Sequence, residues 1–211
     1  FDRELKNLDK INKPLVLTLD TNIQYLIKQE LQLAMSDFKA SGAAGLLMNN
    51  TTGEVLSLVS LPDYNINIRN SIKDKAYTNK ITKGLYELGS VFKTFTVALA
   101  LNEEVFKSES MIKDITRVFK CSIHEIKDIH DFPDSMTVED ILIQSSNVGA
   151  LKIARRIGKE KFKKFIHELN LLSASNFELD EISSPLKVEW KNDCTLESLS
   201  YGHGIMTTPL Q

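Results

Sequence analysis

The sequence lacks the features of several protein classes. A membrane-spanning helix needs an apolar run of ~18 residues, and no run in the 211 residues approaches that length. We therefore expect no membrane-spanning helix within these residues. The sequence has no basic excess, because 26 Lys and Arg stand against 28 Asp and Glu, which disfavours nucleic acid as a partner. Cys121 and Cys194 show no metal-binding spacing, and a disulfide between them is permitted but not indicated. Without repeats or low-complexity tracts, the composition is that of a globular domain.

Hydrophobic periodicity predicts a mixed α/β, helix-rich fold. Residues 1–13 are charged and rich in Asn, and we interpret them as the end of an upstream segment before a domain over 14–211. Thr21 and Gln24 form a capping-box pattern at the start of a helix that Gly42 ends. The apolar stripe of that helix comprises Ile23, Leu26, Ile27, Leu31, Ala34, Met35 and Phe38.

The rest of the chain alternates strands, a long connection and short helices. Two strands, 46–48 and 55–59, are expected across a turn that ends at Gly53. Residues 62–83 form a long polar connection. Further helices are predicted over residues 90–102, 137–144, 148–157 and 159–169.

A hydroxyl and an amine lie one helical turn apart at the first predicted helix start after residue 83. Ser90 and Lys93 follow Gly89 and open a long apolar run. A serine hydroxyl is a weak nucleophile until a base within hydrogen-bond reach takes its proton, and residues three apart on a helix share a face. Burial between Phe92 and Phe95 would lower the pKa of the lysine toward that of a usable base. The pair therefore predicts a serine nucleophile with its base.

The same Ser-x-x-Lys spacing occurs four times, so context has to distinguish the copies. The other matches are Ser36 with Lys39, Ser110 with Lys113 and Ser184 with Lys187. Ser36 and Lys39 lie near the polar end of a predicted helix, and Ser184 directly precedes a proline. Only Ser90 has a preceding glycine and a following apolar helix. The alternative for Ser90 is an ordinary helix N-cap, with Lys93 on a solvated face.

A second motif, Ser145-Ser146-Asn147, is the only Ser-x-Asn of the chain. It falls between two predicted helices. A short extended turn there would point residues i and i+2 the same way and present a hydroxyl beside an amide. The alternative is a helix connection rich in capping residues.

Together and in this order, the two motifs resemble those of the penicillin-recognising serine transferases and hydrolases, whose signature is S-x-x-K, S-D-N and K-T-G. Serine at position 146, in place of aspartate, is ordinary for class B penicillin-binding proteins and tells against a class A β-lactamase. The sequence after Asn147 is most similar to the cell-division, FtsI-type branch. Further similarity covers the domain entry at 17–24, the first hairpin of the central sheet at 45–62, the nucleophile approach at 86–90 and the stretch 201–211.

The resemblance implies a peptidoglycan D,D-transpeptidase that cross-links stem peptides during septum formation and is acylated by β-lactams. Ser90 would attack, with its backbone N–H as half of an oxyanion hole, and Lys93 would accept its proton. Ser145 would relay a proton to the leaving group, and Asn147 would hold the substrate amide. The further substrate-binding candidates are Gly89, Ser146 and His203.

The resemblance also implies a location and partners. A membrane anchor upstream would place the domain in the periplasm, with divisome membrane proteins as partners of the full-length protein. We expect neither a metal nor another cofactor. Cys121, His124, His130 and Asp131 are of types that bind zinc, but related division enzymes carry a similar Ile-His-Asp turn, which favours polar packing in a loop.

One departure from the family pattern is the absence of Lys-Thr-Gly or Lys-Ser-Gly. The chain starts at Phe1 and stops at Gln211, before the family would place that motif. We therefore expect the N-terminal part of a transpeptidase domain, with an incomplete antiparallel sheet and poor activity by itself.

Two other functions share the first two motifs. A serine β-lactamase or penicillin sensor is one, although the class A deacylation base would fall where Ile166 stands, four positions before Asn170. A non-catalytic divisome scaffold is the other.

Overall fold

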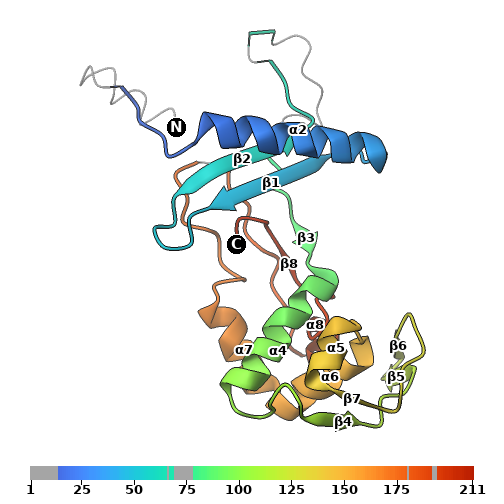
Figure 1. The fold of residues 1–211 in the computed structure, drawn as a ribbon. Helices are drawn as coiled ribbons and strands as arrows, with labels where there is room; N and C mark the ends of the chain where they lie inside the picture. Colours follow the sequence, from blue (N-terminus) through green and yellow to red (C-terminus); the bar gives the residue numbers. More distant parts are fainter. Residues whose placement is uncertain (1–13, 66, 69–77, 180, 192–193) are drawn as a thin grey trace. The chain divides into compact units, whose positions relative to one another are not determined.

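The computed structural model describes residues 14–65, 67–68, 78–179, 181–191 and 194–211 (Figure 1). The upstream segment expected at 1–13 and much of the connection 62–83 lie outside these residues. The chain divides into two compact units, which are considered separately. The first contains residues up to 85, with 174–184 and 208–211, and the second contains 86–173 and 185–207.

The first unit is built on a two-stranded antiparallel sheet. β1 (Ala43–Met48) pairs with β2 (Val55–Leu61), and α2 (Thr21–Asp37) packs on it. Alternate residues of β2 are buried, as expected for a strand with one face against a helix. Gly45 allows the helix to approach, because a Cβ there would lie 2.9 Å from the side chain of Ile27. The structure confirms both predicted strands and lengthens each.

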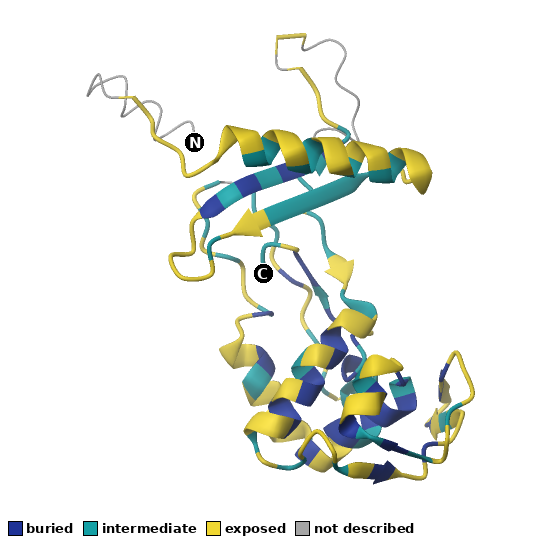
Figure 2. Cartoon of the chain, viewed as in Figure 1, coloured by how far each residue is buried: buried dark blue, intermediate teal, exposed yellow. Residues whose placement is uncertain are grey.

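The start of α2 differs from the capping-box prediction. Asp20 is the N-cap, and its carboxylate accepts hydrogen bonds from the N–H groups of Asn22 and Ile23. Gln24 instead bonds β2, since its Nε2 donates to the carbonyl of Leu58 at 2.8 Å. The predicted stripe was also too wide, because Leu26 and Phe38 are 58% and 81% exposed. Figure 2 shows no buried residue along α2.

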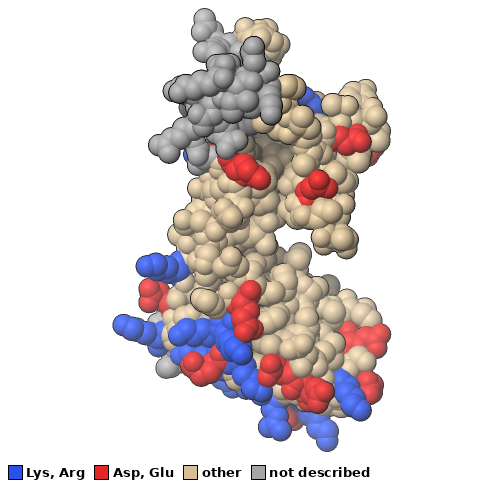
Figure 3. Space-filling model, turned by 90° about the vertical axis from the view of Figure 1, so that its left-hand side faces the viewer, with Lys and Arg blue, Asp and Glu red and all other residues tan. Residues whose placement is uncertain are grey.

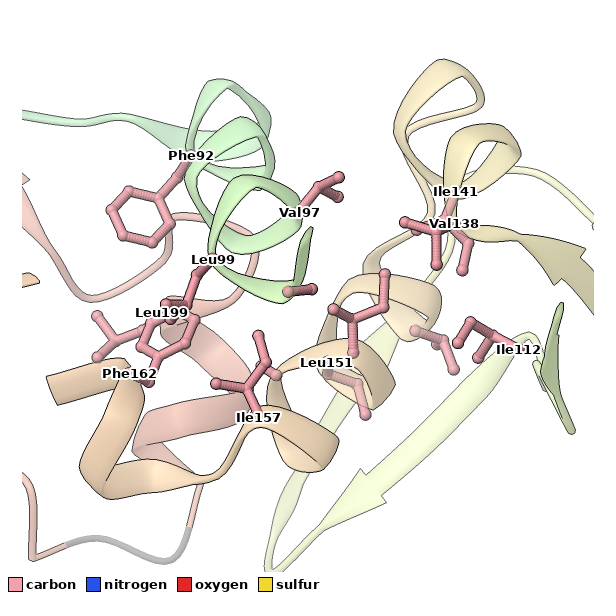
Figure 4. Close-up of a cluster of buried hydrophobic side chains, with 14 of the residues drawn as sticks. Phe92, Val97, Leu99, Ile112, Val138, Ile141, Leu151, Ile157, Phe162 and Leu199 are labelled. Carbon is pink, nitrogen blue, oxygen red and sulfur yellow. The ribbon is translucent and has the colours of Figure 1, made fainter. Parts of the chain in front are cut away.

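The second unit gathers short helices around one apolar core. The helices are α4 (Lys93–Asn102), α5 (Val138–Ile143), α6 (Asn147–Ile157), α7 (Lys159–Glu168) and α8 (Thr195–Leu199). The side chains labelled in Figure 4 come from these helices, from β4 and from the turn before α4. α6 is the most deeply buried of these helices, with Leu151 and Ile153 fully enclosed. Burial of one such side chain contributes about 1.5–3 kcal/mol, so the core fixes the position of α6.

Local signals set the ends of α5 and α6. The side chain of Thr137 caps α5 by accepting from the N–H of Asp140 at 3.0 Å. Ser146 caps α6. The positive charges of Arg155 and Arg156 in its last turn interact favourably with the negative end of the helix dipole. α6 ends at Gly158, whose φ of 93° suits glycine. The helices predicted at 137–144, 148–157 and 159–169 are therefore confirmed within a residue or two.

Three short antiparallel ladders complete the second unit. They are β3 (Tyr86–Glu87) with β8 (Met206–Thr207), β4 (Met111–Lys113) with β7 (Ser135–Thr137), and β5 (Val118–Cys121) with β6 (His124–Lys127). The hairpin of β5 and β6 leads directly to Asp128. On the face that Figure 3 shows, Lys and Arg are interspersed with Asp and Glu. No helix among the described residues is both long and apolar enough to span a bilayer.

Candidate active site

Ser90 lies in a tight turn that presents its hydroxyl to solvent. It belongs to the 3₁₀ helix η2 (Gly89–Phe92), which continues into α4 at Lys93. Gly89, with a φ of 56°, supplies the left-handed residue before the nucleophile. Phe92 is fully buried and anchors the turn in the core. The exposed serine thus rests on a buried support.

Lys93 points into the protein and joins the two sequence motifs. It is 1% exposed, and its Nζ lies 3.2 Å from Ser90 Oγ. The same nitrogen lies 2.9 Å from Ser145 Oγ and 2.5 Å from the Ser145 carbonyl oxygen. The alternative of a solvated lysine is therefore wrong. The structure brings Ser90, Lys93 and Ser145 into one hydrogen-bonded group.

The environment of Lys93 suits a base. Burial lowers the pKa of its amine from 10.5 to about 8, and the nearby charge of Asp128 opposes this shift. A pKa of about 8 leaves roughly a quarter of the amine neutral at a pH of about 7.5. Only the neutral amine can accept a proton from Ser90.

The remaining residues of Ser145-Ser146-Asn147 have different surroundings. Asn147 is the first residue of α6, and its Nδ2 donates to the carbonyl of Lys127 at 2.8 Å. Ser146 is fully buried, and its hydroxyl bonds Asp128 Oδ2 and the Gly149 N–H. We therefore revise the expectation that Ser146 contacts substrate, because its hydroxyl is enclosed as a helix cap.

The loop that contains His203 contacts the chain around Gly89 through Gly202, His203 and Gly204. The Gly89 N–H donates to the carbonyl of Gly202 at 3.2 Å. The exposed His203 lies with its Nδ1 3.2 Å from the Glu87 carboxylate, which also accepts from the Gly204 N–H at 2.8 Å. The loop is thus tied to the strand that precedes Ser90.

Gly202 allows this loop to touch the serine turn. A Cβ on Gly202 would lie 2.1 Å from the Gly89 carbonyl oxygen, whereas one on Gly204 would meet no atom within 4 Å. Their φ values, 81° and 80°, are nearly equal. We expect Gly202→Ala to lower the melting temperature by several degrees and slow acylation, since overpacking costs about 1–3 kcal/mol.

Gly204→Ala is the matched control for that variant. It carries the same left-handed strain without the steric contact, so the difference between the two variants in thermal melting measures the contact alone. Equal effects of the two substitutions would contradict the proposed packing of the loop.

Three features of the sequence have other roles in the structure. Ser110 accepts from the Lys107 N–H and precedes β4, an extended strand, so its spacing to Lys113 does not reproduce a helical pair. Cys121 and Cys194 form a disulfide. Cys121 is thereby removed from the candidate zinc ligands.

Sequence reasoning missed Asp128, which lies buried against the start of α6. The hint in the sequence is an acidic residue between a short hairpin and a Ser-x-Asn motif. No local pattern links the two residues, because Asp128 and Ser146 are 18 positions apart and both β7 and α5 lie between them.

Comparisons with known proteins identify the family of the chain. The family model of the penicillin binding protein transpeptidase domain matches residues 43–211. Peptidoglycan D,D-transpeptidase FtsI of Escherichia coli is 32% identical over 200 residues, covering 93% of this chain and 33% of that protein. A probable peptidoglycan D,D-transpeptidase FtsI of Caulobacter vibrioides is 33% identical over 198 residues, with the same two shares. The chain thus spans about a third of the length of the curated relatives it matches.

A solved structure shows the same fold. The TP domain of penicillin-binding protein 3 from Burkholderia pseudomallei has a TM-score of 0.78 and 27% identity, covering 93% of this chain and 56% of that one. The expected fold class is thereby confirmed. From the match over most of its length and the shared fold, the chain belongs to the penicillin-binding protein transpeptidase domain family.

Proposed function

We propose that this chain carries the nucleophile of a peptidoglycan D,D-transpeptidase, which cross-links stem peptides by serine acyl transfer. One observation carries the proposal: a buried amine, Lys93 Nζ, lies within hydrogen-bond reach of both the exposed Ser90 hydroxyl and Ser145 Oγ. A nucleophile, its base and a second hydroxyl in contact are what acyl transfer requires.

Acylation starts with neutral Lys93. Ser90 Oγ attacks the carbonyl carbon of the penultimate D-alanine and passes its proton to Nζ. The tetrahedral intermediate collapses when the bond to the terminal D-alanine breaks. Ser145 Oγ donates its proton to the departing amine and regains one from Lys93. The products are an acyl-serine and free D-alanine, and the base is neutral again.

Deacylation reverses the roles of these groups. An amine from a neighbouring stem peptide attacks the acyl-serine, and its proton passes through Ser145 to Lys93. Ser90 leaves and recovers its proton from Lys93. The net reaction replaces one peptide bond with another and consumes no cofactor.

Two further groups would stabilise the substrate. The backbone N–H of Ser90 would supply one donor of an oxyanion hole, where preorganised N–H groups stabilise developing charge. The amide of Asn147 would hold the substrate amide, because one N–H bonded to Lys127 fixes its orientation and an amide offers further donors and acceptors.

The branch and location are part of the proposal. For the whole protein we extend the proposal to what the FtsI-type resemblance implies, namely a role in septum formation, a membrane anchor and divisome partners. Relatives named peptidoglycan D,D-transpeptidase FtsI support this branch. The Cys121–Cys194 disulfide supports a periplasmic location, since disulfides persist in oxidising compartments. β-Lactams would enter as substrate mimics and remain as the acyl-serine.

Fluorescent penicillin labelling of the complete gene product tests this function. We expect a covalent label that native protein acquires and heat-denatured protein does not, with a lifetime far longer than one catalytic cycle. Rapid loss of the label would indicate a β-lactamase. Absence of any label would indicate a non-catalytic scaffold and would overturn the proposal.

A further inference from the structure

Asp128 is buried where the β5–β6 hairpin meets the first turn of α6. It is 5% exposed. Its Oδ2 accepts from Ser146 Oγ at 2.9 Å, and its Oδ1 accepts from the N–H groups of Asn147 and, at 3.2 Å, Val148. A buried carboxylate is costly unless hydrogen bonds compensate it, and here three donors do so at the positive end of a helix.

Asp128 and Ser146 together cap the helix that carries the second motif. A helix start leaves four N–H groups without helical partners. Asp128 takes those of Asn147 and Val148, and Ser146 Oγ takes that of Gly149 at 2.8 Å. Because Ser146 donates to Asp128 while accepting from Gly149, the two side chains act as one unit.

This cap borders both residues proposed to act on substrate. Ser145 has a φ of 60°, a left-handed conformation that a non-glycine residue adopts only when its surroundings hold it. Asn147, on the other side, has its backbone N–H bound by Asp128 and its side chain bound by the carbonyl of Lys127. Lys127 and Asp128 therefore hold Ser146 and Asn147 directly, and Ser145 is the residue next to this held pair.

We infer that Asp128 is a positioning residue of the active site, which fixes Ser145 against Lys93 and orients Asn147 by capping α6. The inference rests on the proposed acyl transfer. Asp128 is not a catalytic residue, since it acts through the motif that it caps.

The charge of Asp128 gives the role a readout beyond stability. Among the described residues, Asp128 is the ionisable group whose charge acts on Lys93, and the polar atoms around Nζ belong to Ser90 and Ser145. A carboxylate favours the protonated amine and so holds the pKa of Lys93 up against burial. Removing that charge lowers the pKa of Lys93 and moves the rise of acylation with pH to lower pH.

Asp128→Asn in the complete gene product tests the inference. Asn keeps an oxygen for the backbone N–H groups, but its NH₂ cannot accept from Ser146. We expect acylation by fluorescent penicillin, normalised to the protein that remains folded, to slow by about tenfold to a hundredfold, the range for a lost hydrogen bond to a charged group. The pH midpoint of acylation should fall.

Two further variants complete the experiment. Asp128→Glu keeps the charge, so it should retain the wild-type pH midpoint while acylating more slowly. Asp131→Asn is the matched control, because Asp131 lies in the same segment but is exposed and paired with Arg117 at 3.1 Å. It should acylate like wild type.

The outcomes separate this inference from the proposed function. If the wild type is labelled and Asp128→Asn matches it in acylation rate and pH midpoint, the positioning role alone is overturned. A variant that loses only folded protein, with an unchanged rate and midpoint in what remains, does the same. A wild type that does not label overturns the proposed function and this inference with it.

Discussion

Ser90→Ala should abolish covalent attachment of penicillin to the complete gene product. Alanine removes the Oγ that would form the acyl bond, and the nearby Ser145 hydroxyl already serves Lys93 in another role. The loss should be complete within detection, whereas the fold should persist because the Ser90 side chain is exposed and buries no core atom. Peptide mapping by mass spectrometry would place the wild-type adduct on the peptide containing Ser90.

Other serines with the same lysine spacing are the controls for this variant. Ser110→Ala and Ser36→Ala should label as wild type does, because neither residue lies in a hydrogen-bonded group with Lys93. An adduct that persists in Ser90→Ala, or that maps to either control position, would show that the nucleophile was assigned wrongly.

Lys93→Arg should slow acylation by about a hundredfold to ten-thousandfold, the contribution of a positioned general base. Arginine keeps the positive charge but cannot give up its proton in a protein, so it cannot accept one from Ser90. Wild-type acylation should rise with pH through about 8, because the pKa of Lys93 is about 8 and only its neutral form acts as base. The variant should lose that rise. Stopped-flow acylation over a pH series would measure both effects.

Lys113→Arg is the matched control, since Lys113 occupies the same spacing after Ser110 but is exposed in β4. It should leave the rate and the pH profile unchanged. The larger guanidinium at position 93 could disturb packing, so Lys93→Met provides a second variant without charge. If either position 93 variant acylates at the wild-type rate with the wild-type pH profile, Lys93 is not the base.

The sequence predicted the parts of the site that depend on local geometry. The contact between Ser90 and Lys93 could be predicted because residues three positions apart on a helical turn lie on the same face. The contact of Lys93 with Ser145 could be anticipated only through the family resemblance, since folding of distant segments creates it. Asp128 remained hidden for the same reason.

The errors elsewhere also have physical causes. The place of Ser146 in the motif predicts a contact with substrate, yet in the structure its hydroxyl points inward and caps α6. The cap of α2 moved from Thr21 to Asp20, because Gln24 found partners on β2 instead of on its own helix. The pairing of β3 with β8 is only two residues long and left no periodic signal.

The disulfide divides the candidate site by covalent topology. Cys121 and Cys194 are 73 positions apart and close a ring of chain that contains Asp128, Ser145 and Asn147 but not Ser90. In the chain-entropy description, closing a loop of this length stabilises the fold by about 4 kcal/mol. A single protease cut inside the ring would leave one molecule until a reductant separates the pieces. The half of the site that holds Ser145 thus depends on the thiol chemistry of its compartment, whereas the turn that presents the nucleophile lies outside the ring.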